Sequence, residues 1–249
     1  MKKRITIILL LIITFILISI IFSIIKKTEL FIGGTTKITI SNNDIKIGEN
    51  KKSFSPRKAK ILFNNDFIDG YISSEYIEDG NTYALKLYDK SFNQIVLSSS
   101  IFAYTGNIKI TIPKYETTTY YTKTEKDYIN GILNENNLSG TIDKYTKILV
   151  DIDNDNNYEE LYSVSTSNET NINSIVFIKN DDTSEIIDSK QSELAKAPSI
   201  ESVDFSNIID INDDGIYEIV LINNHGDDST SEYNIYTYKN GEIEKVGDK

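Results

Sequence analysis

Beyond about residue 36, most of the chain consists of short segments in which apolar and polar residues alternate, separated by clusters of Asn, Asp, Gly and Ser. Alternation with a period of two is typical of a β-strand that buries one face, and such clusters are typical of turns. The first segments of this kind lie at 36–40, 60–63, 70–73, 82–89, 94–98 and 107–113. The stretch LKLYDKSFNQIVL predicts a hairpin that turns at about 90–93. We therefore predict an all-β fold, with a small β-sandwich-like domain at 36–113.

One segment breaks the alternation, because residues 5–25 carry no charge and are nearly all Ile, Leu or Phe. At about 1.5 Å per helical residue, this stretch spans the roughly 30 Å hydrocarbon core of a bilayer. It is long for a signal peptide and lacks a small-residue cleavage motif, so an uncleaved single-pass anchor is favoured over a cleaved signal or a buried helix. The basic residues at 2–4 predict that residues 1–27 form a cytoplasmic stub and anchor in the cell membrane, with the body outside the cytoplasm. Residues 28–35 are expected to be a linker.

Residues 114–140 are polar and predict a connector with a short helix at about 125–133. From 141 to 249 the chain repeats itself: KILVDIDNDNNYEELYSV aligns with NIIDINDDGIYEIVL at an offset of about 59 residues, counted along the printed sequence. Each copy contains a strand, an acidic loop, a second strand, a polar loop and two more strands. This order predicts two four-stranded antiparallel sheets, each like one blade of a β-propeller.

Composition narrows the function classes. The chain has 249 residues, no Cys, one His and a net charge of -11. Thiolate metal sites, disulfides and Cys nucleophiles are therefore excluded, and His-rich zinc sites are disfavoured. A protein this acidic repels nucleic acid and attracts cations. No nucleic-acid partner is therefore expected.

Two acidic loops carry the candidate chemistry. When each loop is numbered from its first Asp, carboxylate or amide side chains stand at positions 1, 3, 5 and 9 in both copies. Such spacing in a tight turn suits Ca²⁺, which takes six to eight oxygen ligands, and position 7 contributes a backbone carbonyl. Position 6 favours Gly or Asn because it often needs a left-handed backbone. The candidate calcium ligands are Asp151, Asp153, Asp155, Asn157, Glu159, Asp210, Asn212, Asp214, Ile216 and Glu218.

These loops differ from an EF-hand at position 12, where that motif needs a bidentate Glu. Here the position holds Tyr162 in one copy and Leu221 in the other, and both belong to apolar strand-like segments. The Glu at position 9 therefore closes the site at the mouth of a strand. The alternative is that both loops are hairpin turns of an Asp- and Asn-rich protein without a metal.

The pattern D-x-[DN]-x-[DN]-[GN]-x-Y-E followed by an apolar run resembles the calcium loop of FG-GAP and VCBS-type repeats, the blades of integrin-α-like propellers. The resemblance covers about 142–249 and leaves the N-terminal half unassigned. It implies calcium loops within β-hairpins that rigidify the blades of extracellular or cell-envelope proteins. The sequence departs from the family at Asn156, which replaces the Gly of position 6, and its FG and GAP segments are not recognisable. Two blades do not close a propeller.

Together these features predict a membrane-anchored extracytoplasmic protein with a structural, adhesive or interaction role, no enzymatic activity, and an envelope protein or a glycan as partner. One alternative is an envelope hydrolase that acts on glycans through two carboxylates, with the repeats as accessory modules. A second alternative is an anchored sensor or assembly factor. The single His225, in a polar segment beside Asp227 and Asp228, has no second His or Ser nucleophile motif to form a catalytic set with it.

Overall fold

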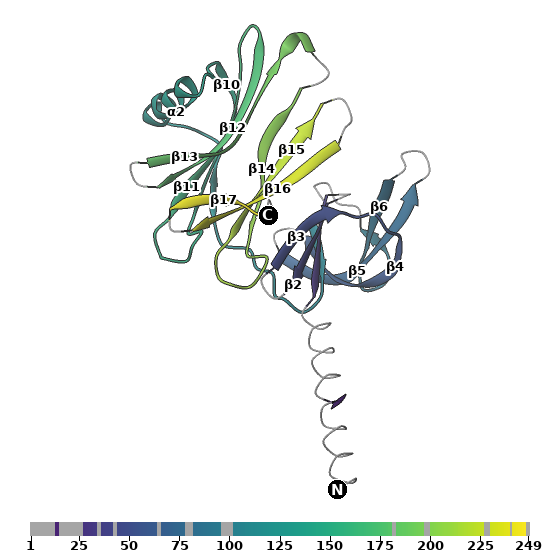
Figure 1. Cartoon of the computed structure of the whole chain (residues 1–249). Helices are drawn as coiled ribbons and strands as arrows, with labels where there is room; N and C mark the ends of the chain where they lie inside the picture. Colours follow the sequence, from purple (N-terminus) through teal and green to yellow (C-terminus); the bar gives the residue numbers. More distant parts are fainter. Residues whose placement is uncertain are drawn as a thin grey trace, which may run out of the picture. The chain divides into compact units, whose positions relative to one another are not determined.

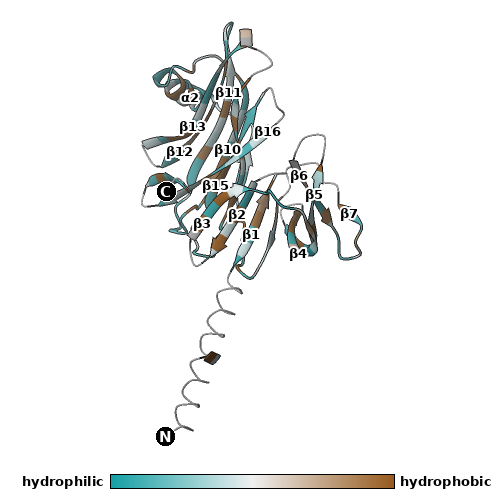
Figure 2. Ribbon diagram, turned by 45° about the vertical axis from the view of Figure 1, so that its right-hand side comes forward, coloured by the Kyte–Doolittle hydropathy of each residue, from teal (hydrophilic) through white to brown (hydrophobic). Residues whose placement is uncertain are grey.

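The computed structural model describes residues 13–14, 27–33, 36–41, 44–63, 66–77, 82–95, 102–180, 183–196, 200–226, 230–239 and 241–247. They form two compact units, within residues 1–109 and 110–249 (Figure 1). Nearly all of the regular structure is antiparallel β-sheet, which confirms the all-β class. Among the coloured residues of Figure 2, apolar positions, in brown, fall mainly within the strands.

The N-terminal unit contains one eight-stranded sheet with the strand order β3-β2-β1-β8-β4-β5-β6-β7. All neighbouring strands in it are antiparallel. The strands are β1 (Thr28–Ile32), β2 (Thr36–Ser41), β3 (Asp44–Glu49), β4 (Phe54–Phe63), β5 (Asp66–Ile77), β6 (Thr82–Tyr88), β7 (Gln94–Ile95) and β8 (Phe102–Thr105). The predicted hairpin at 90–93 is present, since β6 pairs with β7.

Three expectations for the first half of the chain are wrong. Residues 28–32, predicted as part of a linker, form strand β1 in the interior of the sheet. The predicted two-sheet sandwich is a single sheet, in which two strands lie on one side of β1 and five on the other. The reason is that β1 pairs with β2 on one edge and with β8 on the other, and so joins two sets of strands. Residues 107–113 form no strand, and only Thr111 makes an isolated bridge, to Asp210.

A charged cluster joins β1, β2 and β4. Glu29, with 12% of its side chain exposed, pairs with Lys37 at 2.7 Å and with Arg57 at 2.6 Å. The guanidinium of Arg57 also lies 4.2 Å from the ring centroid of Phe54. Burial opposes ionisation of Glu29, but the hydrogen bond from Lys37 and the charges of Arg57 and Lys37 outweigh it and lower its pKa from 4.5 to about 2. The carboxylate is therefore better stabilised in the folded chain than in the unfolded chain.

We expect Glu29→Gln to destabilise the N-terminal unit at pH 7 by on the order of 1–2 kcal/mol, because Lys37 and Arg57 lose their partner. A lowered folded-state pKa stabilises the fold above about pH 4.5, and that stabilisation is lost as the pH falls toward about 2. The difference between the variant and the wild type should shrink over this range. Urea denaturation at several pH values measures it. Glu49→Gln, which removes an exposed partner of Lys51, is the control with little expected effect.

The C-terminal unit contains two antiparallel sheets with the orders β13-β12-β11-β10-β9 and β14-β15-β16-β17. The second sheet repeats the strand order of the first from β10 onward, as the sequence repeat predicts. The elements are β9 (Glu116–Thr118), α2 (Lys123–Glu135), β10 (Thr141–Val150), β11 (Glu159–Ser167), β12 (Asn171–Asn180), β13 (Thr183–Glu193), a 3₁₀ turn at Leu194–Lys196, β14 (Ser202–Ile209), β15 (Glu218–His225), β16 (Thr230–Lys239) and β17 (Glu242–Lys245).

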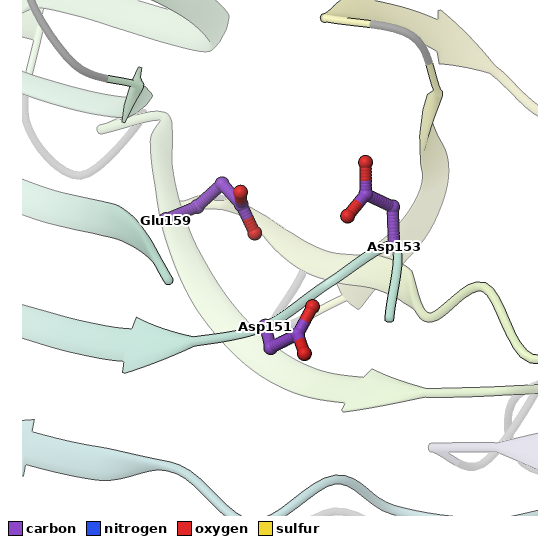
Figure 3. Close-up of side chains that lie close together, drawn as sticks. All are labelled: Asp151, Asp153 and Glu159. Carbon is purple, nitrogen blue, oxygen red and sulfur yellow. The ribbon is translucent and has the colours of Figure 1, made fainter. Parts of the chain in front are cut away.

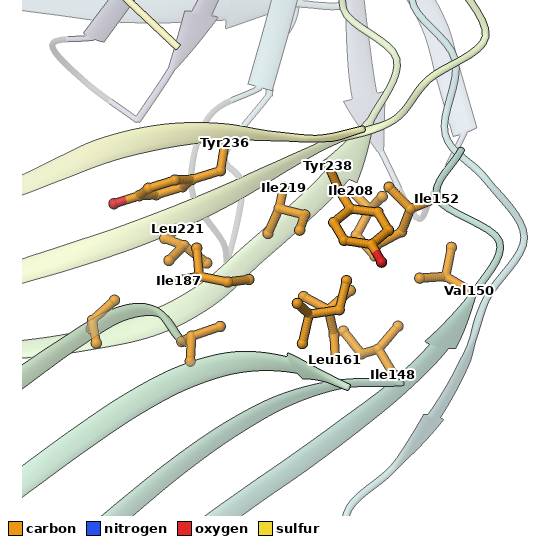
Figure 4. Close-up of a cluster of buried hydrophobic side chains, with 13 residues drawn as sticks. Ile148, Val150, Ile152, Leu161, Ile187, Ile208, Ile219, Leu221, Tyr236 and Tyr238 are labelled. Carbon is orange, nitrogen blue, oxygen red and sulfur yellow. The ribbon is translucent and has the colours of Figure 1, made fainter. Parts of the chain in front are cut away.

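The two sheets pack face to face around an apolar core (Figure 4). The first sheet contributes Ile148, Leu161 and Val176 and the second contributes Ile219 and Leu221, all of them buried. These residues alternate along their strands with residues that point to the opposite face, as period-two patterning requires. The core therefore forms between the two repeats, and neither sheet buries this face alone.

The opposite face of the first sheet is covered by α2 (Figure 1). Ile129, Ile132 and Leu133 of the helix pack against Tyr162 and Phe177 of the sheet. A capping box starts the helix, in which Glu125 N donates to Thr122 Oγ1 at 3.2 Å and Thr122 N donates to Glu125 Oε2 at 2.7 Å. The predicted connector at 114–140 thus supplies a strand and a helix to the C-terminal unit.

No helix in the part of the chain that the structure describes is long and apolar enough to cross a membrane. The predicted anchor at 5–25 lies outside the described residues, apart from Ile13 and Thr14, and it stays a prediction.

Candidate metal site

Each acidic loop joins the first two strands of its repeat. The first acidic loop (residues 151–159) follows β10, where Val150 pairs with Glu159, and the second acidic loop (residues 210–218) follows β14, where Ile209 pairs with Glu218. The register at the base of the two hairpins is therefore the same. Position 9 of each loop is the first residue of the returning strand, as the sequence predicts.

The Glu at position 9 is buried in both loops. Glu159 and Glu218 are each 2% exposed. Ile152 N donates to Glu159 Oε2 at 2.9 Å, and Ile211 N donates to Glu218 Oε2 at 2.9 Å. The side chains of these two Ile residues, at position 2, are fully buried and fix each loop to the apolar interior. Each Glu thus ties position 2 of its loop to the first residue of the returning strand.

The Asp at position 1 organises the turn. Asp151 accepts hydrogen bonds from the backbone N–H groups of Asp155 and Asn156, and Asp210 accepts them from Asp213 and Gly215, among others. Positions 4 and 6 have a positive φ in both loops, and the residues there are Asn154, Asn156, Asp213 and Gly215. Gly, Asn and Asp adopt this conformation at the lowest cost. The Asn at position 6 is therefore compatible with the turn.

In the first loop, three carboxyl groups converge (Figure 3). One oxygen from each of Asp151, Asp153 and Glu159 lies within 4.8 Å of the others. Asp153 Oδ1 is buried and has no hydrogen-bond partner among the described atoms. No Lys, Arg or His among the described residues forms an ion pair with a carboxylate of either loop. A buried carboxylate oxygen without a partner is costly, and a hard cation would satisfy it.

Burial raises the pKa of several of these acids. Desolvation raises the pKa of Glu218 from 4.5 to about 8, and the charges of Asp214 and Asp210 add to the effect. Burial likewise raises the pKa values of Glu159 and Asp210. The pKa of Asp153 rises through burial and through the charge of Asp155. Ionising these acids in the folded chain therefore has a free-energy cost, which a bound cation would offset.

The other predicted ligands lie outside the cluster of Asp151, Asp153 and Glu159. Asp155 is exposed and its carboxylate accepts hydrogen bonds from Asn157 N at 2.7 Å and Asn157 Nδ2 at 3.0 Å. In the second loop, Asn212 Nδ2 donates to Asp214 Oδ2 at 3.0 Å, and Asp214 Oδ1 accepts from Ile216 N at 2.9 Å. A cation coordinated by all the predicted ligands would have to replace some of these hydrogen bonds. Among the described residues, the cluster of converging acids occurs in the first loop, since the second has Asn at position 3.

The sequence pattern missed the contacts between the two loops. Asn154 Nδ2 donates to the carbonyl of Gly215 at 2.8 Å, and Tyr217 N donates to the carbonyl of Ile152 at 2.8 Å. Thr111 exchanges two backbone hydrogen bonds with Asp210, at 3.2 and 2.9 Å. Position 4 carries no metal-ligand signal, and its role follows only from the packing of the two sheets. The loops are thus neighbours in one unit.

Comparison of the chain with family models, with curated proteins and with solved structures finds no match. The case for a function therefore rests on the geometry of the loops.

Proposed function

We propose that the protein binds calcium through its two acidic loops, and that the ions stiffen the hairpins of a two-sheet unit on an extracytoplasmic, membrane-anchored chain. The observation that carries the proposal is the shared geometry of two loops 59 residues apart in sequence (218 − 159). In both, a buried Glu accepts the backbone N–H of position 2 at 2.9 Å through one of its carboxylate oxygens. A hairpin turn without a metal does not require a buried carboxylate at this place.

The role of the ion is structural. Calcium that binds only the folded state stabilises it by RT ln(1 + [L]/Kd), which is about 1.4 kcal/mol per site at a tenfold excess over Kd. The affinity expected for an extracellular module is on the order of 10⁻⁴–10⁻³ M. A blade-like unit held in this way suits an adhesive or interaction surface, with an envelope protein or a glycan as partner.

We expect millimolar Ca²⁺ to raise the melting temperature of the full-length chain, and a chelator to reverse the rise. Calorimetric titration should show two ions per chain. Asp151→Ala and Asp210→Ala should each remove about half of the thermal shift, because each abolishes one site. The measurement is differential scanning calorimetry with and without Ca²⁺.

A matched pair of variants separates ligation from net charge. Asp210→Asn and Asp213→Asn each remove one negative charge from the second acidic loop, at positions three residues apart (213 − 210). Asp213 is exposed and stands at position 4, where Asn tolerates the positive φ. Only Asp210→Asn should lose the calcium response of its loop. An absent response in the wild type, or equal losses in the two variants, would reject the calcium site.

A further inference from the structure

An exposed aromatic residue in the N-terminal unit is held in an unfavourable backbone conformation. Phe92 has a φ of 62° and is 55% exposed. For a bulky residue, the left-handed region costs about 1–2 kcal/mol, and Gly or Asn would avoid that cost. More than half of the residue's surface is exposed, so burial in a core is not the reason that Phe stands here. Residues in such conformations cluster at ligand contacts, where the surrounding structure holds them.

The turn that carries Phe92 is rigidly built. Asp89 Oδ1 accepts hydrogen bonds from Ser91 N at 2.7 Å and from Asn93 N at 2.9 Å, and Asp89 Oδ2 accepts one from Asn93 Nδ2 at 2.9 Å. Backbone bonds from Phe92 N to Asp89 O and from Asp89 N to Asn93 O close the turn. Five hydrogen bonds thus fix the position of one exposed ring.

A second ring supports Phe92 from the sheet. The rings of Phe92 and Tyr71, on β5, stack with centroids 4.1 Å apart and planes 20° apart. This contact covers one face of the Phe92 ring, and its exposed fraction of 55% leaves the other face to solvent. The pair forms a flat aromatic platform of fixed orientation. Such a face attracts the polarised C–H groups of a ring stacked on it.

Beside the platform lies a hollow of about 480 Å³, lined by Phe67, Ile68, Asp69, Asp89, Lys90 and Ser91. Asp69 accepts from Lys60 Nζ at 2.6 Å and from Lys90 Nζ at 3.2 Å, and both pairs are largely exposed. The two lysines and the carboxylates of Asp69 and Asp89 balance in charge. The hollow therefore offers donors and acceptors without a net charge that would select an ion.

We propose that the Phe92 turn and this hollow form a binding site for a neutral glycan. One face of a pyranose ring stacks on Phe92, and its hydroxyl groups exchange hydrogen bonds with Asp69, Lys90 and Ser91. The volume lies within the range of small-ligand sites, roughly 300–1,000 Å³. A neutral polyol matches a site in which the charges are already paired, whereas an ionic ligand would have to compete with those pairs. The site lies in the N-terminal unit and does not rest on the calcium proposal.

The test uses the full-length chain and four neutral oligosaccharides. These are the tetramers of N-acetylglucosamine, of β-1,4-linked glucose, of α-1,4-linked glucose and of mannose. Saturation-transfer NMR and calorimetric titration measure binding at millimolar sugar. We expect at least one to bind, and Phe92→Gly to weaken it about tenfold or more. This variant removes the ring and also relieves the backbone strain, so its melting temperature should stay close to that of the wild type. Tyr120→Ala, which removes an aromatic ring that is 85% exposed in the other unit, is the control with unchanged binding.

Binding should persist in chelator, which separates it from any effect of calcium on the C-terminal unit. Three outcomes overturn the proposal: no neutral tetramer binds, Phe92→Gly binds as well as the wild type, or a uronic-acid tetramer binds in clear preference to all neutral ones. Lys90→Ala provides a second check that leaves the turn intact. It should weaken the same sugar without changing the aromatic stack.

Discussion

In chelator at pH 8, Glu218→Gln is expected to melt at a higher temperature than the wild type, and in saturating Ca²⁺ at a lower one. Glu218 is 2% exposed and burial raises its pKa to about 8, so at this pH it is only about half ionised in the folded chain, whereas it is fully ionised in the unfolded chain. The amide keeps an oxygen that can accept from Ile211 N, as the carboxylate does. It loses the charge, and with it both the desolvation cost and the attraction for a cation. The variant should therefore be more stable without calcium and unresponsive at this loop with it.

The pH dependence follows from the raised pKa of Glu218. A folded-state pKa of about 8, against 4.5 in the unfolded chain, means that the stabilisation is complete below about pH 4.5 and is lost as the pH rises through about 8. The loss is on the order of 4–5 kcal/mol at 1.36 kcal/mol per pKa unit. In chelator, the wild type should thus become less stable from pH 5 to pH 8, while Glu218→Gln should show a flatter profile.

Thermal denaturation across this pH range, with and without Ca²⁺, measures both effects. At roughly 2–4 °C per kcal/mol, a shift of 5 °C or more is expected in chelator at pH 8. Glu242→Gln makes the same chemical change at an exposed position of β17 and should change neither profile. If Glu218→Gln destabilises the chain equally in chelator and in calcium, Glu218 has only a structural role.

The repeat was predictable because period-two alternation and turn residues are local signals. Both acidic loops, their place between the first two strands and the position-9 Glu were all expected from the spacing. The helix also depends on local signals, since Thr122 and Glu125 form a capping box and Ile129 and Leu133 are buried one turn apart on one face. These features depend on neighbours within a few residues of one another.

Other features depend on contacts that local patterns do not encode. The short TELFI segment is predicted as a linker because it follows an apolar stretch, yet β1 pairs with β8, whose partner residues lie 70 to 76 positions further along the chain (102 − 32 and 105 − 29). Phe92 gives no sequence signal, since its importance comes from its φ and from the ring of Tyr71. The hydrogen bonds that the Asp155 carboxylate accepts from Asn157 and the Asp214 carboxylate accepts from Asn212 are likewise set by loop geometry.

The second large effect is expected from Phe177→Ala. Phe177 is fully buried on β12, and its ring stacks on that of Tyr162 with centroids 4.8 Å apart. It also lies beneath α2, in contact with the Tyr128 ring at 6.3 Å. Removing a buried aromatic ring costs about 3–5 kcal/mol, because the cavity left behind only partly collapses. Urea denaturation should show this loss, whereas Phe63→Ala, at a position 41% exposed, should cost far less.

Phe177→Ala also tests whether the two faces of the first sheet act independently. The Phe177 core and the acidic loops lie in different clusters, since Ile148, Val150 and Ile152 pack toward the second sheet and Phe177 packs toward α2. Distant sites usually contribute additively to stability. The variant should therefore keep the full increment of stability from Ca²⁺ while its baseline falls. A lost calcium increment would mean that docking of α2 sets the geometry of the loops, because β11 begins at Glu159 and carries Tyr162 on the helix-covered face.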